Sequence, residues 1–210
     1  MARTVGPLMS LGASGSVANT ITFSTWKGRP YVRQLVTPSN PKSPLQLSTR
    51  AIMKFLSQQW TPNIDAAEQA TWEALGAADA ISPFNAYTRE NLRRWTQFTA
   101  PGQASPVTLT GTLPTWTTLP DATGGVRQAT ITWDLNTLNQ AWGLLIFRST
   151  TGGFTPSRDN LVGVAYLATL TADSFIDTPL VPDTYFWNFI AFTSDGLKSA
   201  ALGQQTAVVL

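Results

Sequence analysis

The stretch Thr184-Tyr-Phe-Trp-Asn-Phe-Ile-Ala-Phe-Thr193 is a strand-like run of aromatic and aliphatic residues between two turn signals, Pro182-Asp183 and Asp195-Gly196. Short apolar runs bounded by Gly, Pro and Asp are typical of β-strands. Similar runs recur through the second half of the chain, at 107–113, 126–134, 142–149, 161–170, 172–177 and 204–210. Further turn signals separate them at Thr123-Gly-Gly125, Gly152-Gly153 and Pro179. Seven short strands with regular turns predict a β-sandwich over residues 107–210.

Upstream of the sandwich, apolar residues at helical spacing predict about three short helices over residues 44–98. The helices would start at Ser43-Pro44, Thr61-Pro62 and Ser82-Pro83, where a hydroxyl residue precedes a proline, and Gly76 would end the second. Helices of this number and size are too few to bury a robust core alone. We therefore expect them to pack on the preceding hairpin or on a partner.

Residues 21–36 predict a β-hairpin, because two extended apolar-polar patterns flank the turn chemistry of Lys27-Gly-Arg-Pro30. The Gly- and Ser-rich residues 1–20 predict a flexible arm, and the prolines within 37–44 predict a stiff tether. Residues 100–106 have the composition of a linker. The predicted organisation is an arm at 1–20, an α+β anchoring module at 21–99, a linker at 100–106 and an all-β sandwich at 107–210.

Charge is distributed unevenly along the chain. No acidic side chain precedes Asp65, whereas seven cations do: Arg3, Lys27, Arg29, Arg33, Lys42, Arg50 and Lys54. Residues 1–100 carry ten Lys/Arg and five Asp/Glu, a net charge of +5, and residues 101–210 carry four and seven, a net charge of −3. This asymmetry indicates two units with different partners. Since only 12% of residues are charged and eight are Trp, much of the surface would be neutral or apolar, as in a component of an assembly.

The composition excludes several kinds of chemistry. The chain has no Cys and no His, which excludes disulfides, Cys/His zinc sites, thiol nucleophiles and the Ser-His-Asp triad. The acidic residues expected on the helices are not accompanied by a base, a nucleophile or a metal ligand. The turn Asp residues of the second half do not form the run of closely spaced oxygen ligands that a calcium site needs. No apolar run approaches the about 18 residues of a membrane span. We expect no enzymatic activity, no cofactor and no metal.

The candidate binding surface is the segment around the hairpin turn, where aromatic residues alternate with cations. The candidate residues are Trp26, Lys27, Arg29, Tyr31, Arg33, Asn40, Lys42 and Arg50. Docking to an acidic protein surface is favoured over a solvated hairpin. Binding of nucleic acid, in which these aromatics would stack on bases, is least favoured, because +5 in 100 residues is a modest charge excess. For Asn40–Pro44, a tether with a helix cap is favoured over a recognition segment.

Several motifs occur together in the first half of the chain. They are the Trp26-Lys-Gly28 hairpin, the Asn40-Pro-Lys-Ser43 segment, Gln46 and Arg50, the spaced Trp60 and Trp72, and Phe84-Asn-Ala-Tyr87 with Asn91. Over residues 15–95 this set resembles a family of small tailed-bacteriophage and prophage proteins that are labelled virion structural proteins. The family usually has a small residue where this chain has Pro44.

A second resemblance lies in Asp177–Ser199. Tyr185 would pack at the corner that enters the penultimate strand, Asp195-Gly196 would turn into the last strand, and Ile131-Thr-Trp133 would belong to the second strand. This arrangement is similar to a fibronectin type III or immunoglobulin-like domain. The resemblance implies an Ig-like sandwich of the kind that phages display on their outer surfaces.

Together the two resemblances imply a non-enzymatic structural protein of a tailed-phage virion, assembled in the bacterial host cytoplasm. A basic anchor followed by an exposed sandwich favours a capsid decoration protein, present in many copies, with the major capsid protein or another virion lattice protein as partner. A neck, tail or baseplate component is the alternative within this class. Two other classes stay open: a carbohydrate-binding host-adsorption module acting through Trp142 or Phe154, and a nucleic-acid-binding packaging factor.

Overall fold

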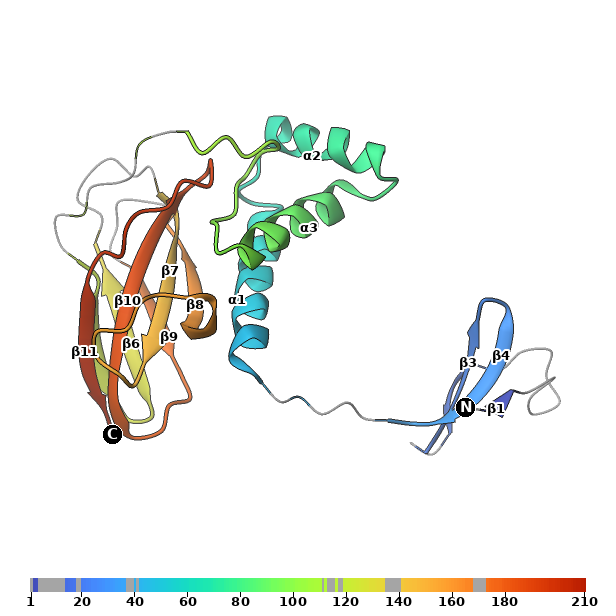
Figure 1. The fold of residues 1–210 in the computed structure, drawn as a ribbon, viewed down its shortest axis with the longest axis horizontal. Coiled ribbons are helices and arrows are strands. Elements are labelled where there is room, and N and C mark those ends of the chain that lie inside the picture. Colours follow the sequence, from blue (N-terminus) through green and yellow to red (C-terminus); the bar gives the residue numbers. More distant parts are fainter. Residues whose placement is uncertain are drawn as a thin grey trace. The chain divides into compact units, whose positions relative to one another are not determined.

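The computed structural model describes residues 2–3, 14–17, 20–36, 40, 42–110, 112, 116, 119–134, 141–167 and 173–210. The chain forms two compact units, Met1–Pro41 (unit 1) and Lys42–Leu210 (unit 2) (Figure 1). The boundary between the units falls just before the first helix. Residues 100–106, where a linker is expected, do not divide the chain into compact units.

Unit 1 is an antiparallel sheet with the strand order β1-β4-β3-β2. Its strands are β1 (Ala2–Arg3), β2 (Gly15–Val17), β3 (Ile21–Trp26) and β4 (Arg29–Gln34). The β3–β4 pair confirms the predicted hairpin, and its turn residues Lys27 and Gly28 have φ of 49° and 73°, positive values that suit a tight I′ hairpin turn.

The segments expected as arm and tether are described only in part. Two pieces of the expected arm over 1–20 form β1 and β2, whereas residues 4–13 and 18–19 lie outside the described residues. Of the expected tether over 37–44, residues 37–39 and 41 also lie outside them.

Unit 2 begins with the predicted helices, which follow local start signals. They are α1 (Pro44–Gln59), α2 (Ala66–Ala78) and α3 (Pro83–Thr96). The starts expected at Ser43-Pro44 and Ser82-Pro83 are confirmed. The start expected at Thr61-Pro62 is wrong, because Asp65 and Glu68 form a reciprocal capping box in which each side chain accepts a hydrogen bond from the other residue's backbone amide, over 2.8 Å in both cases.

The capping box of α2 makes a measurable contribution to stability. We expect Asp65→Ala to lower the free energy of unfolding of unit 2 by about 1 kcal/mol, because the Glu68 amide loses its acceptor. Urea denaturation followed by circular dichroism measures this change. Glu73→Ala, which removes an exposed acid from the same helix, is the control and should stay within about 0.5 kcal/mol of the wild type. Equal losses in the two variants would contradict a capping role.

The remaining strands confirm the predicted β-sandwich. One antiparallel sheet has the order β5-β6-β9 and the other the order β11-β10-β7-β8. The strands are β5 (Asp121–Gly125), β6 (Gln128–Trp133), β7 (Ala141–Ser149), β8 (Leu161–Tyr166), β9 (Asp173–Asp177), β10 (Asp183–Thr193) and β11 (Gln204–Val209). The Tyr185 hydroxyl donates a hydrogen bond of 3.0 Å to the Val181 carbonyl oxygen, which is the tyrosine corner of Ig-like sandwiches.

Two details of the strand prediction are wrong. A strand is predicted at 107–113, but residues 107–110 form no strand. Most of the remaining residues of that range lie outside the described residues. Residues 121–125 form β5, where Thr123-Gly-Gly125 is predicted as a turn. A Cβ at Gly124 would lie 1.8 Å from the carbonyl oxygen of Val208 on β11, so this glycine allows two strand backbones to approach closely and does not mark a turn.

Strand β10 is buried on both faces, which explains why its apolar run does not alternate with polar residues. Trp187 and Phe189 point into the core between the two sheets. Ile190 and Phe192 belong to a second core, which they share with residues of the three helices. Figure 1 shows α1 alongside β8, at one side of the sandwich.

This second core joins the helices to the sandwich. The ring centroid of Phe55 on α1 lies 5.0 Å from that of Trp142 and 5.6 Å from that of Phe192. The segment expected as a linker is also fixed, because the Asn91 side chain exchanges two hydrogen bonds with the Gly102 backbone, of 3.0 and 2.8 Å. The helices thus bury their apolar side chains against the outer face of the sandwich. The prediction that hairpin and helices form one module at 21–99 is therefore wrong, because the helices and the sandwich form a single unit.

Candidate functional site

The hairpin residues expected to bind a partner lie on one face of the unit 1 sheet. Cross-strand pairing sets Trp26 opposite Arg29 and places Tyr31 and Arg33 on the same face, because paired residues in an antiparallel sheet point the same way. Trp26 is 64% exposed, and Nζ of Lys27 in the turn lies 5.0 Å from its ring centroid. These five residues form what we call the cationic-aromatic face.

The opposite face of the same sheet is apolar. Val17 pairs with Ile21, and Phe23 pairs with Val32, so the four side chains share that face. Val17 and Ile21 are 50% and 43% exposed. The described residues of unit 1 form only this one layer, and a chain of about 40 residues rarely buries enough surface to be stable by itself. Both faces of the sheet thus carry exposed side chains, Trp26 on one and Val17 and Ile21 on the other.

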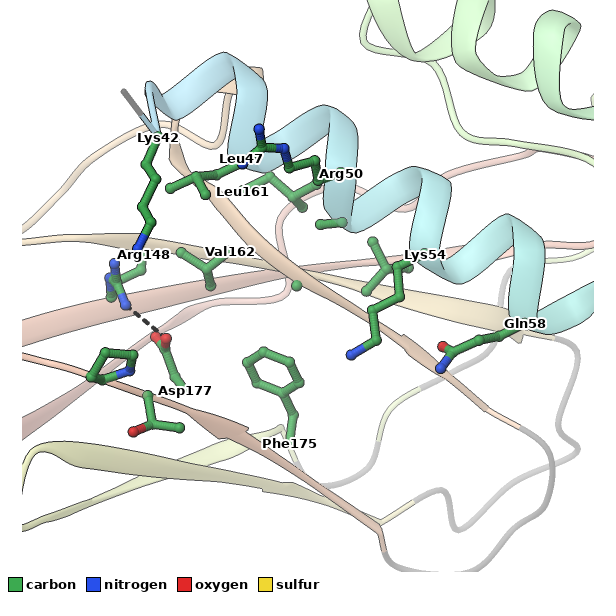
Figure 2. A pocket seen from close by; sticks show the side chains of 15 residues that line it. Lys42, Leu47, Arg50, Lys54, Gln58, Arg148, Leu161, Val162, Phe175 and Asp177 are labelled. Atoms are coloured by element: carbon green, nitrogen blue, oxygen red, sulfur yellow. Dashed lines mark hydrogen bonds and ion pairs between the residues drawn. The ribbon is translucent and has the colours of Figure 1, made fainter. Parts of the chain in front are cut away.

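The remaining expected residues do not belong to this face. Asn40 is exposed. Lys42 and Arg50 belong to unit 2, where they line a groove of about 660 Å³ between α1 and the edge strands β8 and β9. Figure 2 shows Arg50, Lys54 and Gln58 following one another along α1. The expected site residues thus belong to both units: the hairpin residues lie in unit 1, and Lys42 and Arg50 line the groove of unit 2.

Two further cations line the groove, Lys54 and Arg148. Lys54 could have been found in the sequence, since it follows Arg50 by one helical turn on a helix without acidic residues. Arg148 could not, because only the tertiary structure brings this residue of β7 to Asp177 of β9, which belongs to the other sheet. Its Nη1 donates a hydrogen bond of 2.7 Å to Oδ1 of Asp177, the one acidic residue among the described residues that line the groove (Figure 2).

Titratable groups with displaced pKa values serve the structure of unit 2. Burial raises the pKa of the Glu68 carboxyl, which caps α2. Burial lowers the pKa of Lys198, whose amine donates a 2.7 Å hydrogen bond to the Phe98 carbonyl oxygen and so ties the sandwich to the end of α3. Burial also lowers the pKa of Arg94, which donates to the Ala100 carbonyl oxygen over 2.9 Å. All three groups hold helices or connections in place.

Other kinds of site find little support in the described part of the chain. Among the described residues, no group of three or more His, Cys, Asp or Glu side chains could hold a metal ion. None of the described helices combines the length and the apolar character needed to cross a membrane. Trp142 is 4% exposed and donates to Oε1 of Gln59 over 3.3 Å, and Phe154 packs against the helix-sandwich core. The carbohydrate-binding alternative therefore loses Trp142 as a surface platform.

No protein family and no characterised protein matches the sequence. Among solved structures, the chain is similar to a β-1,2-glucanase from Parabacteroides distasonis, with 18% identity, a TM-score of 0.34 and coverage of 47% of this chain but only 14% of the glucanase. It is similar to an Fn3-like protein from Clostridium thermocellum, with 17% identity, a TM-score of 0.34 and coverage of 47% and 96%. Fibronectin(III)-like modules of Clostridium thermocellum CbhA match with 14% identity, a TM-score of 0.30 and coverage of 44% and 91%.

The strand order and the tyrosine corner define the fold independently of these likenesses. Unit 2 combines three helices with an Ig-like sandwich of the fibronectin III kind, and unit 1 is a small antiparallel sheet. The candidate sites are two surfaces for binding, the cationic-aromatic face of unit 1 and the groove of unit 2.

Proposed function

We propose that the chain is a non-enzymatic structural protein of a tailed-bacteriophage virion. Unit 1 would attach it to a lattice of virion proteins, and unit 2 would display the Ig-like sandwich. The role that we propose is decoration of the capsid, with the major capsid protein as partner and many copies on each particle. The virion assignment rests on the sequence resemblance of the hairpin, the Asn40-Pro-Lys-Ser43 segment and the spaced Trp60 and Trp72. A neck, tail or baseplate position is the alternative within this class.

The observation that supports attachment is the cationic-aromatic face. Trp, Tyr and Arg are the residue types that most often dominate the binding energy of protein interfaces, and here Trp26, Tyr31, Arg29 and Arg33 share one face of a small sheet. Residues 1–41 contain four Lys/Arg and no Asp/Glu, a net charge of +4. This charge favours an acidic partner surface, which would speed encounter and select the orientation of docking.

The apolar face opposite supports attachment for a second reason. A single-layer sheet that leaves Val17 and Ile21 half exposed gains stability when another surface covers these side chains. Association with a lattice would supply that cover. Unit 1 is thus expected to be more ordered when attached than when the chain is free, and hydrogen exchange of the β3 amides is expected to slow on attachment.

The attachment can be tested with two substitutions on the cationic-aromatic face. We expect Trp26→Ala and Arg33→Ala each to weaken co-sedimentation of the full chain with capsids by about 30-fold, the effect of losing an interface residue worth about 2 kcal/mol. Capsids, tails and complete virions of the phage or prophage that encodes the chain would be purified separately. Binding would be measured by sedimentation at a series of chain concentrations.

The matched control is Arg93→Ala, which removes a cation that is 74% exposed on α3 of unit 2. It should bind as the wild type does. Wild-type binding by both hairpin variants would refute attachment through this face. Binding to tails but not to capsids would replace decoration by the neck, tail or baseplate role. Binding to DNA with steep salt dependence and to no particle would favour the packaging role instead.

A further inference from the structure

We infer that the groove between α1 and the β8–β9 edges binds an acidic peptide segment of a partner protein, in which carboxylates alternate with apolar side chains. This inference does not rest on the proposed attachment through unit 1, since the groove lies wholly within unit 2. The groove is lined on one side by α1 and on the other by β8 and β9 (Figure 2).

The α1 side of the groove carries cations without acidic partners. Lys42, Arg50 and Lys54 form no ion pair with any carboxylate in the described part of the chain, and all three are exposed. Arg50 and Lys54 are four residues apart on α1, a spacing at which like charges destabilise a helix. An acidic ligand would relieve this repulsion, because its carboxylates would lie between the two cations.

The opposite side does not neutralise these charges. Asp177 is buried and each of its oxygens has a partner: Oδ1 accepts from Arg148 over 2.7 Å and Oδ2 accepts from the Trp187 indole over 3.0 Å. With Arg148 and Asp177 cancelling each other, the groove keeps the three positive charges of Lys42, Arg50 and Lys54. Lys42 also has a φ of 49°, an uncommon backbone conformation for a residue with a side chain; such outliers gather at binding sites.

The apolar part of the lining distinguishes a peptide from other anions. Leu47 is 43% exposed at the groove, and Phe175 and Pro179 contribute further apolar surface. A sugar-phosphate chain or a free phosphate would leave the exposed parts of these side chains in contact with water, whereas leucine-like side chains between carboxylates would cover them. The volume, about 660 Å³, suits a few side chains.

The charge of unit 2 as a whole also argues for a short acidic segment over nucleic acid. Residues 42–210 contain ten Lys/Arg and twelve Asp/Glu, a net charge of −2. A nucleic-acid surface normally carries a broad positive excess, whereas unit 2 has a small negative net charge and only four of its ten Lys/Arg line the groove. A peptide that reaches only the groove avoids the remaining acidic surface.

The test uses the full chain and a fluorescein-labelled nonapeptide of alternating Glu and Leu, with binding measured by fluorescence anisotropy. We expect saturable binding that weakens with added salt and falls about tenfold in Lys54→Gln and in Arg50→Gln, the loss of one charge-assisted hydrogen bond each. Arg93→Gln, an exposed cation on α3, is the matched control and should bind as the wild type does.

Two competing probes complete the test. The same peptide with Gln in place of Glu should bind at least about tenfold more weakly, and a single-stranded DNA oligonucleotide should not displace the acidic peptide. Equal binding of the Gln peptide, displacement by DNA, or unchanged affinity in Lys54→Gln would each overturn the inference. Because α1 exposes both substituted side chains, circular dichroism should show that the variants remain folded.

Discussion

Phe55→Ala is expected to lower the free energy of unfolding of unit 2 by about 3–5 kcal/mol, the range for removing a fully buried aromatic side chain from a core. Phe55 is 2% exposed and forms edge contacts with Trp142 and Phe192. Its loss would leave a cavity between α1 and the outer face of the sandwich. Urea unfolding followed by far-ultraviolet circular dichroism and by tryptophan fluorescence would measure the change.

The same experiment decides whether helices and sandwich form one cooperative unit. If they share a core, helix and sandwich signals should change in one transition in the wild type, and Phe55→Ala should move both to lower urea concentration. Loss of the helix signal alone, with the sandwich transition unchanged, would restore the division at residues 100–106. Leu45→Ala is the control, because Leu45 lies on the same helix and is 45% exposed, so little change is expected.

Asp177→Ala is expected to lower the free energy of unfolding by about 3 kcal/mol, because two side chains, Arg148 and Trp187, lose the carboxylate to which they donate hydrogen bonds. The Trp187 indole, which is fully buried, would lose its acceptor. Arg148 would lose its ion pair, although its side chain is 27% exposed and keeps some contact with water. This exposure places the expected cost near the lower end of the range for breaking a buried pair.

Asp173→Ala is the matched control for this second variant. Asp173 lies on the same strand and is exposed, and within the described part of the chain it accepts a hydrogen bond only from the next backbone amide, so its loss should change stability by less than about 0.5 kcal/mol. Thermal or urea unfolding of the two variants provides the comparison. If Asp177→Ala were as stable as Asp173→Ala, the pairing of Asp177 with Trp187 and Arg148 would contribute nothing to the fold.

The elements that the sequence predicts correctly are those with local causes. The β3–β4 hairpin follows from alternation on each side of Lys27-Gly28, and the starts of α1 and α3 follow from Ser-Pro pairs. The start of α2 was missed because the reciprocal bonds of Asp65 and Glu68 outweigh the Thr61-Pro62 signal. The capping box and the Thr61-Pro62 pair are both local start signals, and the capping box is the stronger of the two.

The errors of larger scale have tertiary causes. Gly124 resembles a turn residue, but it serves the close approach of β5 to β11. Residues 100–106 resemble a flexible linker, but the Asn91 side chain and the Trp72 indole bind their backbone. In each case a partner far away in sequence determines the conformation, so composition alone misleads.

The candidate binding residues show the same division. The sequence correctly placed Trp26, Arg29 and Arg33 together, because a hairpin register puts them on one face. It also grouped Lys42 and Arg50 with them, although these two line a groove on unit 2 with Arg148. Nearness in sequence was a good guide within the hairpin, whereas Lys42 and Arg50 belong to the other compact unit, which begins at residue 42.

By itself, the sequence determined the hairpin, the three helices, six of the seven described strands of the sandwich and the absence of Cys and His chemistry, because each depends on residue types or on neighbours along the chain. Only the tertiary structure decided what covers the outer face of Thr184–Thr193. Its run is apolar on both faces, and burying the second face requires a layer that no local pattern identifies. α1 supplies part of that layer, and its packing against β8 also creates the cationic groove.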